Sequence, residues 1–141
     1  MTLGQAGCSG TPLYKKLGIK PQMNVLVIDG LRDYEALVSG VEPVAFTHAD
    51  LAHLPGRHYP VVHLFCADTA ALQASFDAAS RCVAEGGMIW VSWPKKSSNL
   101  FRDLTEDHIR AQVLPGGIWV DVKVCAVTAD WSGLKFLRRK R

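Results

Sequence analysis

Five side chains near the ends of predicted strands are of the types that bind ligands. Trp93, Lys95 and Lys96 follow one predicted strand, and Asp130 and Trp131 lie in the turn between the last two strands. A tryptophan ring beside two ammonium groups can stack on an aromatic ring and hold an anion. The alternative is an ordinary loop in which the tryptophan packs and the lysines are solvated. The functional interpretation therefore predicts a small anionic or aromatic ligand at this position.

A second candidate is the turn Asp29–Gly30–Leu31, which follows the apolar run Val25 to Ile28. A nucleotide-binding α/β domain has a glycine-rich turn at this point, so that backbone amides approach the cofactor closely. This turn has a single glycine, and we therefore expect no bound cofactor. Asp29 has two interpretations: a base or a contact to a ribose or an amine, or a cap on the following helix.

The histidines and cysteines predict neither a metal site nor a disulfide framework. Four histidines recur every five residues, at His48, His53, His58 and His63. Five residues turn a helix by about 140°, and nearby prolines exclude a helix, so these side chains do not share a face. The cysteines form no C-x-x-C pair and stand at Cys8, Cys66, Cys82 and Cys125. Three of them lie in apolar stretches, where a free thiol packs as a small hydrophobic group.

Length and charge indicate one near-neutral domain with a basic end. The chain has 141 residues and a net charge of +3, four positive charges of which belong to Arg138–Arg141, so the rest carries −1. We expect residues 1–10 to be flexible and residues 138–141 to form an unpacked tail. The favoured interpretation of this tail is a solubilising end with no partner, and the alternative is a weak contact with nucleic acid or an acidic partner. No apolar run approaches the roughly 20 residues of a membrane span. Residues 1–10 do not resemble a signal peptide, which favours a cytoplasmic protein.

Hydrophobic patterning and turn residues predict an alternating set of helices and strands. We expect helices at 11–18 and 31–40, one from Asp68 or Thr69 to the Gly86–Gly87 pair, and one from a capping box at Asp103–Glu106 to about Leu114. Strands are expected at 25–28, 44–47, 61–66, 88–92, 119–127 and 134–137. This order predicts a single α/β domain over residues 1–141. It has a three-layer, Rossmann-like, mostly parallel six-stranded sheet with a C-terminal antiparallel hairpin.

The layout resembles a class I S-adenosylmethionine-dependent methyltransferase over most of residues 11 to 138. The resemblance rests on Leu17–Pro21 before the first strand and on Ala84–Val91 late in the chain. It implies a methyltransferase-like fold that ends in the same hairpin, shortened by about one strand and one helix. The family's loop motif has an acid at Val27 and glycines at Asp29 and Leu31, and none of the three matches. No cofactor residues are carried over, and we expect no tight binding of S-adenosylmethionine.

The sequence also resembles a bacterial family known only as a domain of unknown function, which implies a bacterial source and no activity. The similar stretches are residues 9–13, 15–20, 90–96, 121–127 and 131–135.

Two functions remain open at this point. The favoured hypothesis is a non-catalytic binding or interaction module on a methyltransferase-like scaffold. The alternative is an atypical S-adenosylmethionine-dependent methyltransferase, or another small-molecule enzyme with an altered site. The absence of the glycines in the turn after the first strand favours the binding module.

Overall fold

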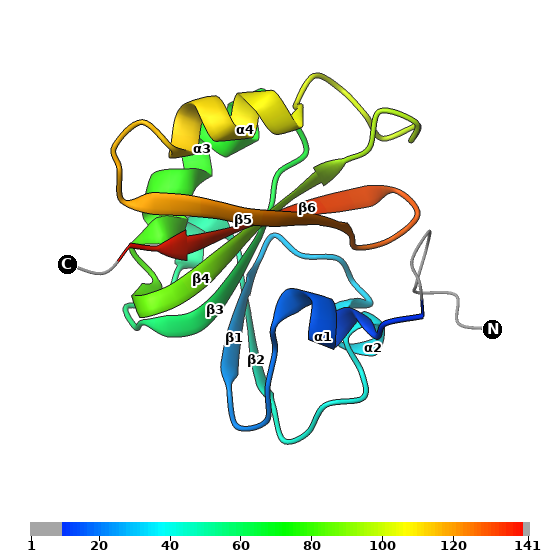
Figure 1. Ribbon diagram of the computed structural model, residues 1–141, viewed down its shortest axis with the longest axis vertical. Coiled ribbons are helices and arrows are strands. Elements are labelled where there is room, and N and C mark those ends of the chain that lie inside the picture. Colours follow the sequence, from blue (N-terminus) through cyan, green and yellow to red (C-terminus); the bar gives the residue numbers. More distant parts are fainter. Residues whose placement is uncertain (1–9, 140–141) are drawn as a thin grey trace.

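The computed structural model describes residues 10–139, in which helices alternate with the strands of one mixed sheet (Figure 1). The elements are α1 (Leu13–Leu17), β1 (Asn24–Ile28), α2 (Tyr34–Leu37), β2 (Ala45–Ala49), the 3-10 turn η1 (Leu51–His53), β3 (Tyr59–Phe65), α3 (Thr69–Ser80), β4 (Val83–Pro94), α4 (Glu106–Val113), β5 (Trp119–Ala126) and β6 (Trp131–Arg138). The predicted α/β class is confirmed. No helix within residues 10–139 is long and apolar enough to cross a membrane.

The six strands lie in the order β2-β1-β3-β4-β6-β5. Strands β2, β1, β3 and β4 run parallel to one another, whereas β6 is antiparallel to both β4 and β5. The carboxyl ends of the four parallel strands therefore share one edge of the sheet. Because a βαβ sheet binds ligands beyond those ends, this edge is where a site is expected.

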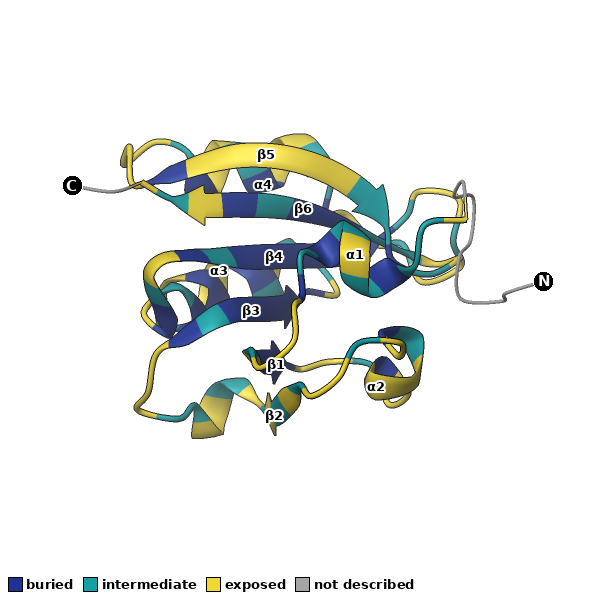
Figure 2. Ribbon diagram, turned by 60° about the horizontal axis from the view of Figure 1, so that its bottom comes forward, coloured by how far each residue is buried: buried dark blue, intermediate teal, exposed yellow. Residues whose placement is uncertain are grey.

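Each face of the sheet is covered by its own pair of helices (Figure 2). The amphipathic α3 and α4 bury Leu72 and Ile109 against one face. The shorter α1 and α2 bury Leu17 and Tyr34 against the other. Adjacent strand residues point to opposite faces, so the central strands read as continuous apolar runs, as in Val25 to Ile28.

Two expected helix boundaries are wrong. The pair Gly86–Gly87 lies inside β4 and does not end α3, which stops at Ser80. Gly87 is needed there because a Cβ would lie 2.9 Å from the Ala84 carbonyl oxygen and 3.0 Å from that of Pro60. The expected helix over 31–40 is reduced to the single turn α2.

The cap of α4 also differs from the prediction. Thr105 is the N-cap, and its Oγ1 accepts a hydrogen bond from the His108 amide at 3.3 Å while His108 Nδ1 accepts one from the Thr105 amide. Asp103 instead accepts a hydrogen bond from the amide of Thr69 at 2.9 Å, which lowers the pKa of its carboxyl group. Asp103 therefore connects the start of α3 to the segment before α4.

The expectation of an unpacked basic tail is wrong for its first two residues. Arg138 is the last residue of β6, and its guanidinium donates a hydrogen bond to the Val83 carbonyl at 3.0 Å. Arg139 donates through Nε to the Gly117 carbonyl at 2.9 Å. Strand β6 runs to Arg138, and these two hydrogen bonds hold both arginines against the protein despite the repulsion between neighbouring cations. The other two cations of the predicted tail, and residues 1–9 with Cys8, lie outside the described residues.

Candidate functional site

The turn after β1 and the end of β2 together enclose an open depression of about 540 Å³ at the carboxyl edge of the sheet. Its lining residues are Asp29, Gly30, Leu31, Arg32, His48, Ala49, Asp50 and His53. Strands β1 and β2 are parallel and paired in register up to Ile28 and Ala49, which brings the two following segments together. The backbone amide of Asp29 donates to the Ala49 carbonyl at 2.9 Å and fixes this juxtaposition.

The turn takes a conformation that its sequence did not predict. Asp29 has a φ of 53°, in the left-handed region that glycine usually occupies. Aspartate tolerates this region better than most residues do, because its short side chain can bond locally. A Cβ at Gly30 would collide with the side chain of Val27, so the single glycine is required where the chain folds over β1. Asp29 thus supplies the bend that we expected a second glycine to provide.

Asp29 does not cap α2, which was the alternative interpretation of this residue. The N-cap of that helix is Asp33, which makes no side-chain capping bond. The Asp29 carboxyl group lies at the depression, where partial burial and the neighbouring carboxylate of Asp50 raise its pKa. The depression therefore places two carboxyl groups close enough to repel each other when both are ionised.

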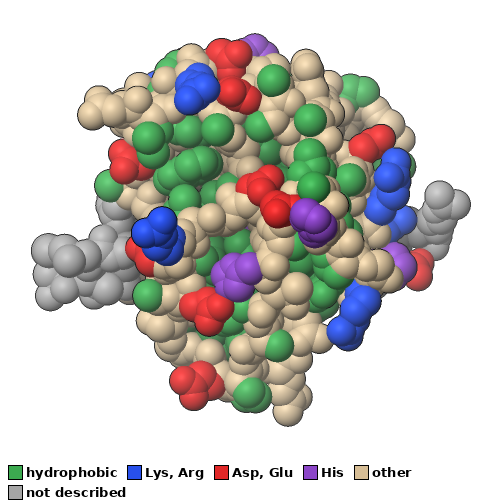
Figure 3. Space-filling view, turned by 180° about the vertical axis from the view of Figure 1, so that it is seen from behind, with side chains coloured by type: hydrophobic (Ala, Val, Ile, Leu, Met, Phe, Trp, Pro, Cys, Tyr) green, Lys and Arg blue, Asp and Glu red, His purple; other side chains and the backbone are tan. Residues whose placement is uncertain are grey.

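Histidines flank these carboxyl groups on the exposed surface. His53 Nδ1 lies 2.9 Å from an Asp50 carboxylate oxygen, and this contact lowers the pKa of Asp50. His48 Nε2 lies 2.6 Å from a carboxylate oxygen of Glu35. Acidic and histidine side chains neighbour each other in this way on the face that Figure 3 shows. Within residues 10–139, no three His, Cys, Asp or Glu side chains form a group that could hold a metal ion.

A second depression, of about 350 Å³, lies at the carboxyl end of β4. Its lining residues are Trp93, Lys95, Lys96, Thr105, Glu106, Asp107 and Ser132. Three of the candidate residues from the sequence are thus together. The Trp93 side chain is only 6% exposed, however, and belongs to the core, so little of its ring is available to stack on a ligand.

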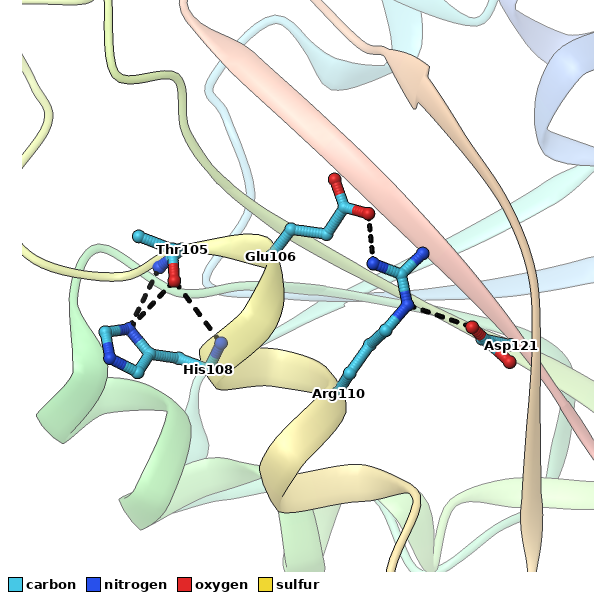
Figure 4. Close-up of polar contacts among 5 residues, drawn as sticks. All are labelled: Thr105, Glu106, His108, Arg110 and Asp121. Carbon is cyan, nitrogen blue, oxygen red and sulfur yellow. Dashed lines mark hydrogen bonds and ion pairs between the residues drawn. The ribbon is translucent and has the colours of Figure 1, made fainter.

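Both acidic and basic side chains surround this second depression. Glu106 pairs with the guanidinium of Arg110, which also donates through Nε to Asp121 at 2.9 Å (Figure 4). Within the described part of the chain, Lys95 and Lys96 form no ion pair. The two ammonium groups thus line the depression beside Asp107 and the Glu106–Arg110–Asp121 network, with no ion-pair partner of their own among the described residues.

The expectation that Trp131 shares this depression with Trp93 is wrong. Trp131 pairs across the sheet with Pro94, whereas Ser132 pairs with Trp93. Since neighbours along a strand point to opposite faces, Trp131 lies on the other face, where its ring contacts Phe65 at a centroid distance of 5.4 Å.

Asp130 stands at the same end of the sheet as these tryptophans but does not line the depression. Its carboxylate accepts a hydrogen bond from the Ser98 hydroxyl at 2.8 Å. Its carbonyl accepts one from the Lys95 amide at 2.8 Å. Asp130 thus holds the loop that carries the two lysines.

Sequence reasoning missed Asp50 and His53 as candidates. A usable signal was present, because Asp50 follows Gly30 by 20 residues. In dinucleotide-binding βαβ units an acidic residue at about this spacing hydrogen-bonds the ribose. This spacing belongs to a fingerprint with several glycines, and the turn after β1 has only one of them.

Comparisons with known proteins give a result for the fold but none for the sequence. No protein-family model matches the chain. No curated protein matches it either. The resemblance to a bacterial family of unknown function therefore stays a prediction.

The structure is similar to several solved methyltransferases. The N-methyltransferase NodS from Bradyrhizobium japonicum WM9 has a TM-score of 0.59 and 10% identity, covering 93% of this chain and 99% of that one. The 1,6-didemethyltoxoflavin-N1-methyltransferase of Burkholderia thailandensis, solved with S-adenosylhomocysteine, has a TM-score of 0.61 and 15% identity, covering 91% and 75%. The magnesium protoporphyrin IX methyltransferase of Synechocystis PCC 6803, solved with S-adenosylmethionine, has a TM-score of 0.57 and 12% identity, covering 90% and 74%. At these identities the likeness establishes a methyltransferase-like fold.

These comparisons correct our favoured functional hypothesis. We expected a non-catalytic binding or interaction module, but the three similar structures reported above are methyltransferases, and two of these three were solved with S-adenosylmethionine or S-adenosylhomocysteine. They support the alternative hypothesis better than the favoured one. The physical premise was also incomplete, because Asp29 adopts the left-handed bend without a second glycine.

Proposed function

We propose that the protein is an S-adenosylmethionine-dependent methyltransferase whose donor binds in the depression between the turn after β1 and the end of β2. The observation that carries this proposal is the placement of Asp29, Gly30 and Asp50 around that depression, on a fold shared with donor-binding methyltransferases. S-adenosylmethionine supplies an electrophilic methyl group on a positively charged sulfur. The proposal concerns how this chain's own residues hold such a molecule.

The charge of the depression suits a cationic ligand. Asp29 and Asp50 repel each other, and this repulsion contributes to the raised pKa of Asp29. A sulfonium and an α-ammonium group bring positive charge that relieves the repulsion between the two carboxylates. A bound donor therefore lowers the pKa of Asp29 again, because its positive charge favours the ionised carboxylate.

Asp50 is the residue best placed to bind the ribose of the donor. It stands directly after β2, and its carboxylate oxygens accept hydrogen bonds from hydroxyl groups. Its contact with His53 is on the exposed surface, so it is readily exchanged for a contact with a ligand. The 20-residue spacing from Gly30 supports the same assignment.

We propose the second depression, beside Trp93, Lys95 and Lys96, as the place of the methyl acceptor. Strand β4 is two positions from β1 in the sheet, so its end lies roughly 10 Å away along the same edge. The ammonium groups of Lys95 and Lys96, which form no ion pair among the described residues, favour an acceptor that carries a carboxylate or phosphate. Asp130 contributes by holding the lysine-bearing loop.

Isothermal titration calorimetry with S-adenosylmethionine and S-adenosylhomocysteine tests the donor site. We expect binding in the micromolar range and a loss of about tenfold in affinity for Asp50→Asn, since one charge-assisted hydrogen bond is worth about 1.4 kcal/mol or more. The matched control is Asp77→Asn, which neutralises an exposed carboxylate on α3, away from the depression. Absence of both heat and thermal stabilisation at millimolar donor would overturn the proposal.

A further inference from the structure

Three polar side chains form a continuous hydrogen-bonded chain inside the core that α1 and α2 cover. Tyr34 Oη lies 2.8 Å from His63 Nδ1, and His63 Nε2 lies 2.7 Å from Ser92 Oγ. All three residues are 0% exposed. The chain connects the first residue of α2 with the central strands β3 and β4.

The buried imidazole is held neutral by its surroundings. Burial lowers the pKa of His63 to about 3, and the ring stacks on Phe65 at a centroid distance of 4.3 Å. A neutral imidazole has one N–H and one acceptor nitrogen, so it can bond a hydroxyl on each side in the same state. The arrangement satisfies every polar atom only while both hydroxyls are present, since an unpaired buried polar group is costly.

The hydrogen-bonded side chains of Tyr34, His63 and Ser92 lie directly beneath the proposed donor site. Tyr34 follows Gly30 by four residues, and its amide donates to the Leu31 carbonyl at 3.1 Å. A Cβ at Gly30 would lie 3.6 Å from the Phe65 ring, which stacks on His63. The segment from Gly30 to Tyr34 is thus anchored at one end by a phenol hydroxyl and supported at the other by an aromatic ring.

Tyr34 also contacts the strand that forms the second wall of the depression. Its ring packs edge-on against Phe46 and His48 of β2, at centroid distances of 6.0 and 6.5 Å. His48 lines the depression itself. The buried side chain of Tyr34 therefore connects α2, the element after β1, with β2, the strand before Asp50.

We propose that the Tyr34–His63–Ser92 chain is a positioning device that holds the Asp29–Gly30 turn and the end of β2 in the geometry that binds the donor. This proposal rests on the proposed function. The three side chains support the donor site from inside the core and do not contact the ligand. A hydrophobic trio of similar volume would fill the same core without fixing the direction of Tyr34. Two directional hydrogen bonds fix both the ring of Tyr34 and the segment that precedes it.

Tyr34→Phe tests the device, because it removes only the hydroxyl and keeps the ring. We expect the amides of residues 29–34 to exchange at least tenfold faster relative to the amides of β4, and the affinity for S-adenosylhomocysteine to fall at least fivefold. Ser92→Ala breaks the other end and is expected to give the same local pattern. The matched control is Tyr59→Phe at the start of β3, a tyrosine that is 3% exposed and stands at the opposite end of the strand.

The outcomes separate a positioning role from a merely structural one. Faster exchange confined to residues 29–34, with weaker binding and with Tyr59→Phe unchanged, supports the device. Exchange that rises uniformly along the chain, or an affinity equal to that of the wild type, would overturn it. If the wild-type protein binds no S-adenosylhomocysteine, the donor proposal fails, and the exchange measurement still decides whether the buried chain holds the turn.

Discussion

The two faces of the sheet differ in the polarity of the side chains that they bury. The face under α3 and α4 buries apolar side chains such as Leu72, Ile109 and Phe136, and the polar Ser75 there bonds back to its own helix. The face under α1 and α2 has an apolar core of its own, and through it runs the hydrogen-bonded chain of Tyr34, His63 and Ser92. Both cores meet at the same strands.

The helices on the two faces differ in length, and this explains why one face depends on directional hydrogen bonds. The helices α3 and α4 have 12 and 8 residues and bury continuous apolar stripes, so hydrophobic packing suffices to hold them. By contrast, α2 is a single turn of 4 residues that buries only Tyr34. Such a short helix is marginal by itself. We infer that the first face supplies most of the stability and the second supplies the precision of the site.

The largest expected loss of stability comes from truncating a buried side chain on the face under α3 and α4. Leu72→Ala removes a side chain that is 0% exposed, and we expect the free energy of unfolding to fall by about 2–5 kcal/mol. Urea denaturation measures this loss. The folded fraction should bind S-adenosylhomocysteine with unchanged affinity. A large loss of affinity at equal folded concentration would show that the face under α3 and α4 also determines the geometry of the donor site.

The next effect comes from the polar face. His63→Leu leaves the hydroxyls of Tyr34 and Ser92 without their partner, and we expect a loss of about 1–3 kcal/mol in unfolding free energy. In contrast to Leu72→Ala, this change should also weaken donor binding. His63→Gln, whose amide can bond both hydroxyls, serves as the conservative control. Equal affinities for the leucine variant and the wild type would contradict the proposed role of this face.

The stability of the wild type and of His63→Gln should also differ in its dependence on pH. The pKa of His63 falls from 6.5 to about 3 on folding, so the unfolded chain takes up a proton near pH 6.5 that the folded protein refuses. The contribution of the neutral histidine is complete above pH 6.5 and is lost as the pH falls toward 3. Between pH 6 and pH 5 the wild type should lose about 1 kcal/mol more than His63→Gln does. Parallel stability curves for the two proteins would show that His63 is not held neutral.

The smallest effect concerns the second depression. Lys95→Ala and Lys96→Ala remove ammonium groups that form no ion pair with the described residues, so stability should change by less than about 0.5 kcal/mol. Donor affinity should also be unchanged, because these lysines lie two strands away from β1. Thermal unfolding and calorimetry check both points. A clear fall in donor affinity would move the donor site toward β4.

Much of the fold follows from local patterns in the sequence. The expected strands at Val25 to Ile28 and Val61 to Cys66 overlap most of β1 and β3. Asp68 caps α3 through the Ala71 amide, as its type and position suggest. The length of β4 does not follow, because Gly86 and Gly87 are typical of a helix end. The close approach of the Ala84 and Pro60 carbonyl oxygens explains why Gly87 stands inside this strand.

The candidate site was less predictable, for two physical reasons. The conformation of Asp29 depends on the contacts of its turn and not on residue type alone, so counting glycines underestimated the site. His63 belongs to the series of histidines for which we predicted no metal site. Its partners Tyr34 and Ser92 are each 29 residues away, and no spacing rule connects them.

The location of the donor is the central claim, and a titration of the 15N-labelled protein with S-adenosylhomocysteine, followed by heteronuclear NMR, tests it most directly. We predict shifts concentrated at the amides of residues 29–32 and 48–53, which line the depression after β1 and β2. Lys95 and Lys96 should move little. Shifts centred on the loop after β4, or no shifts at millimolar ligand, would contradict the claim.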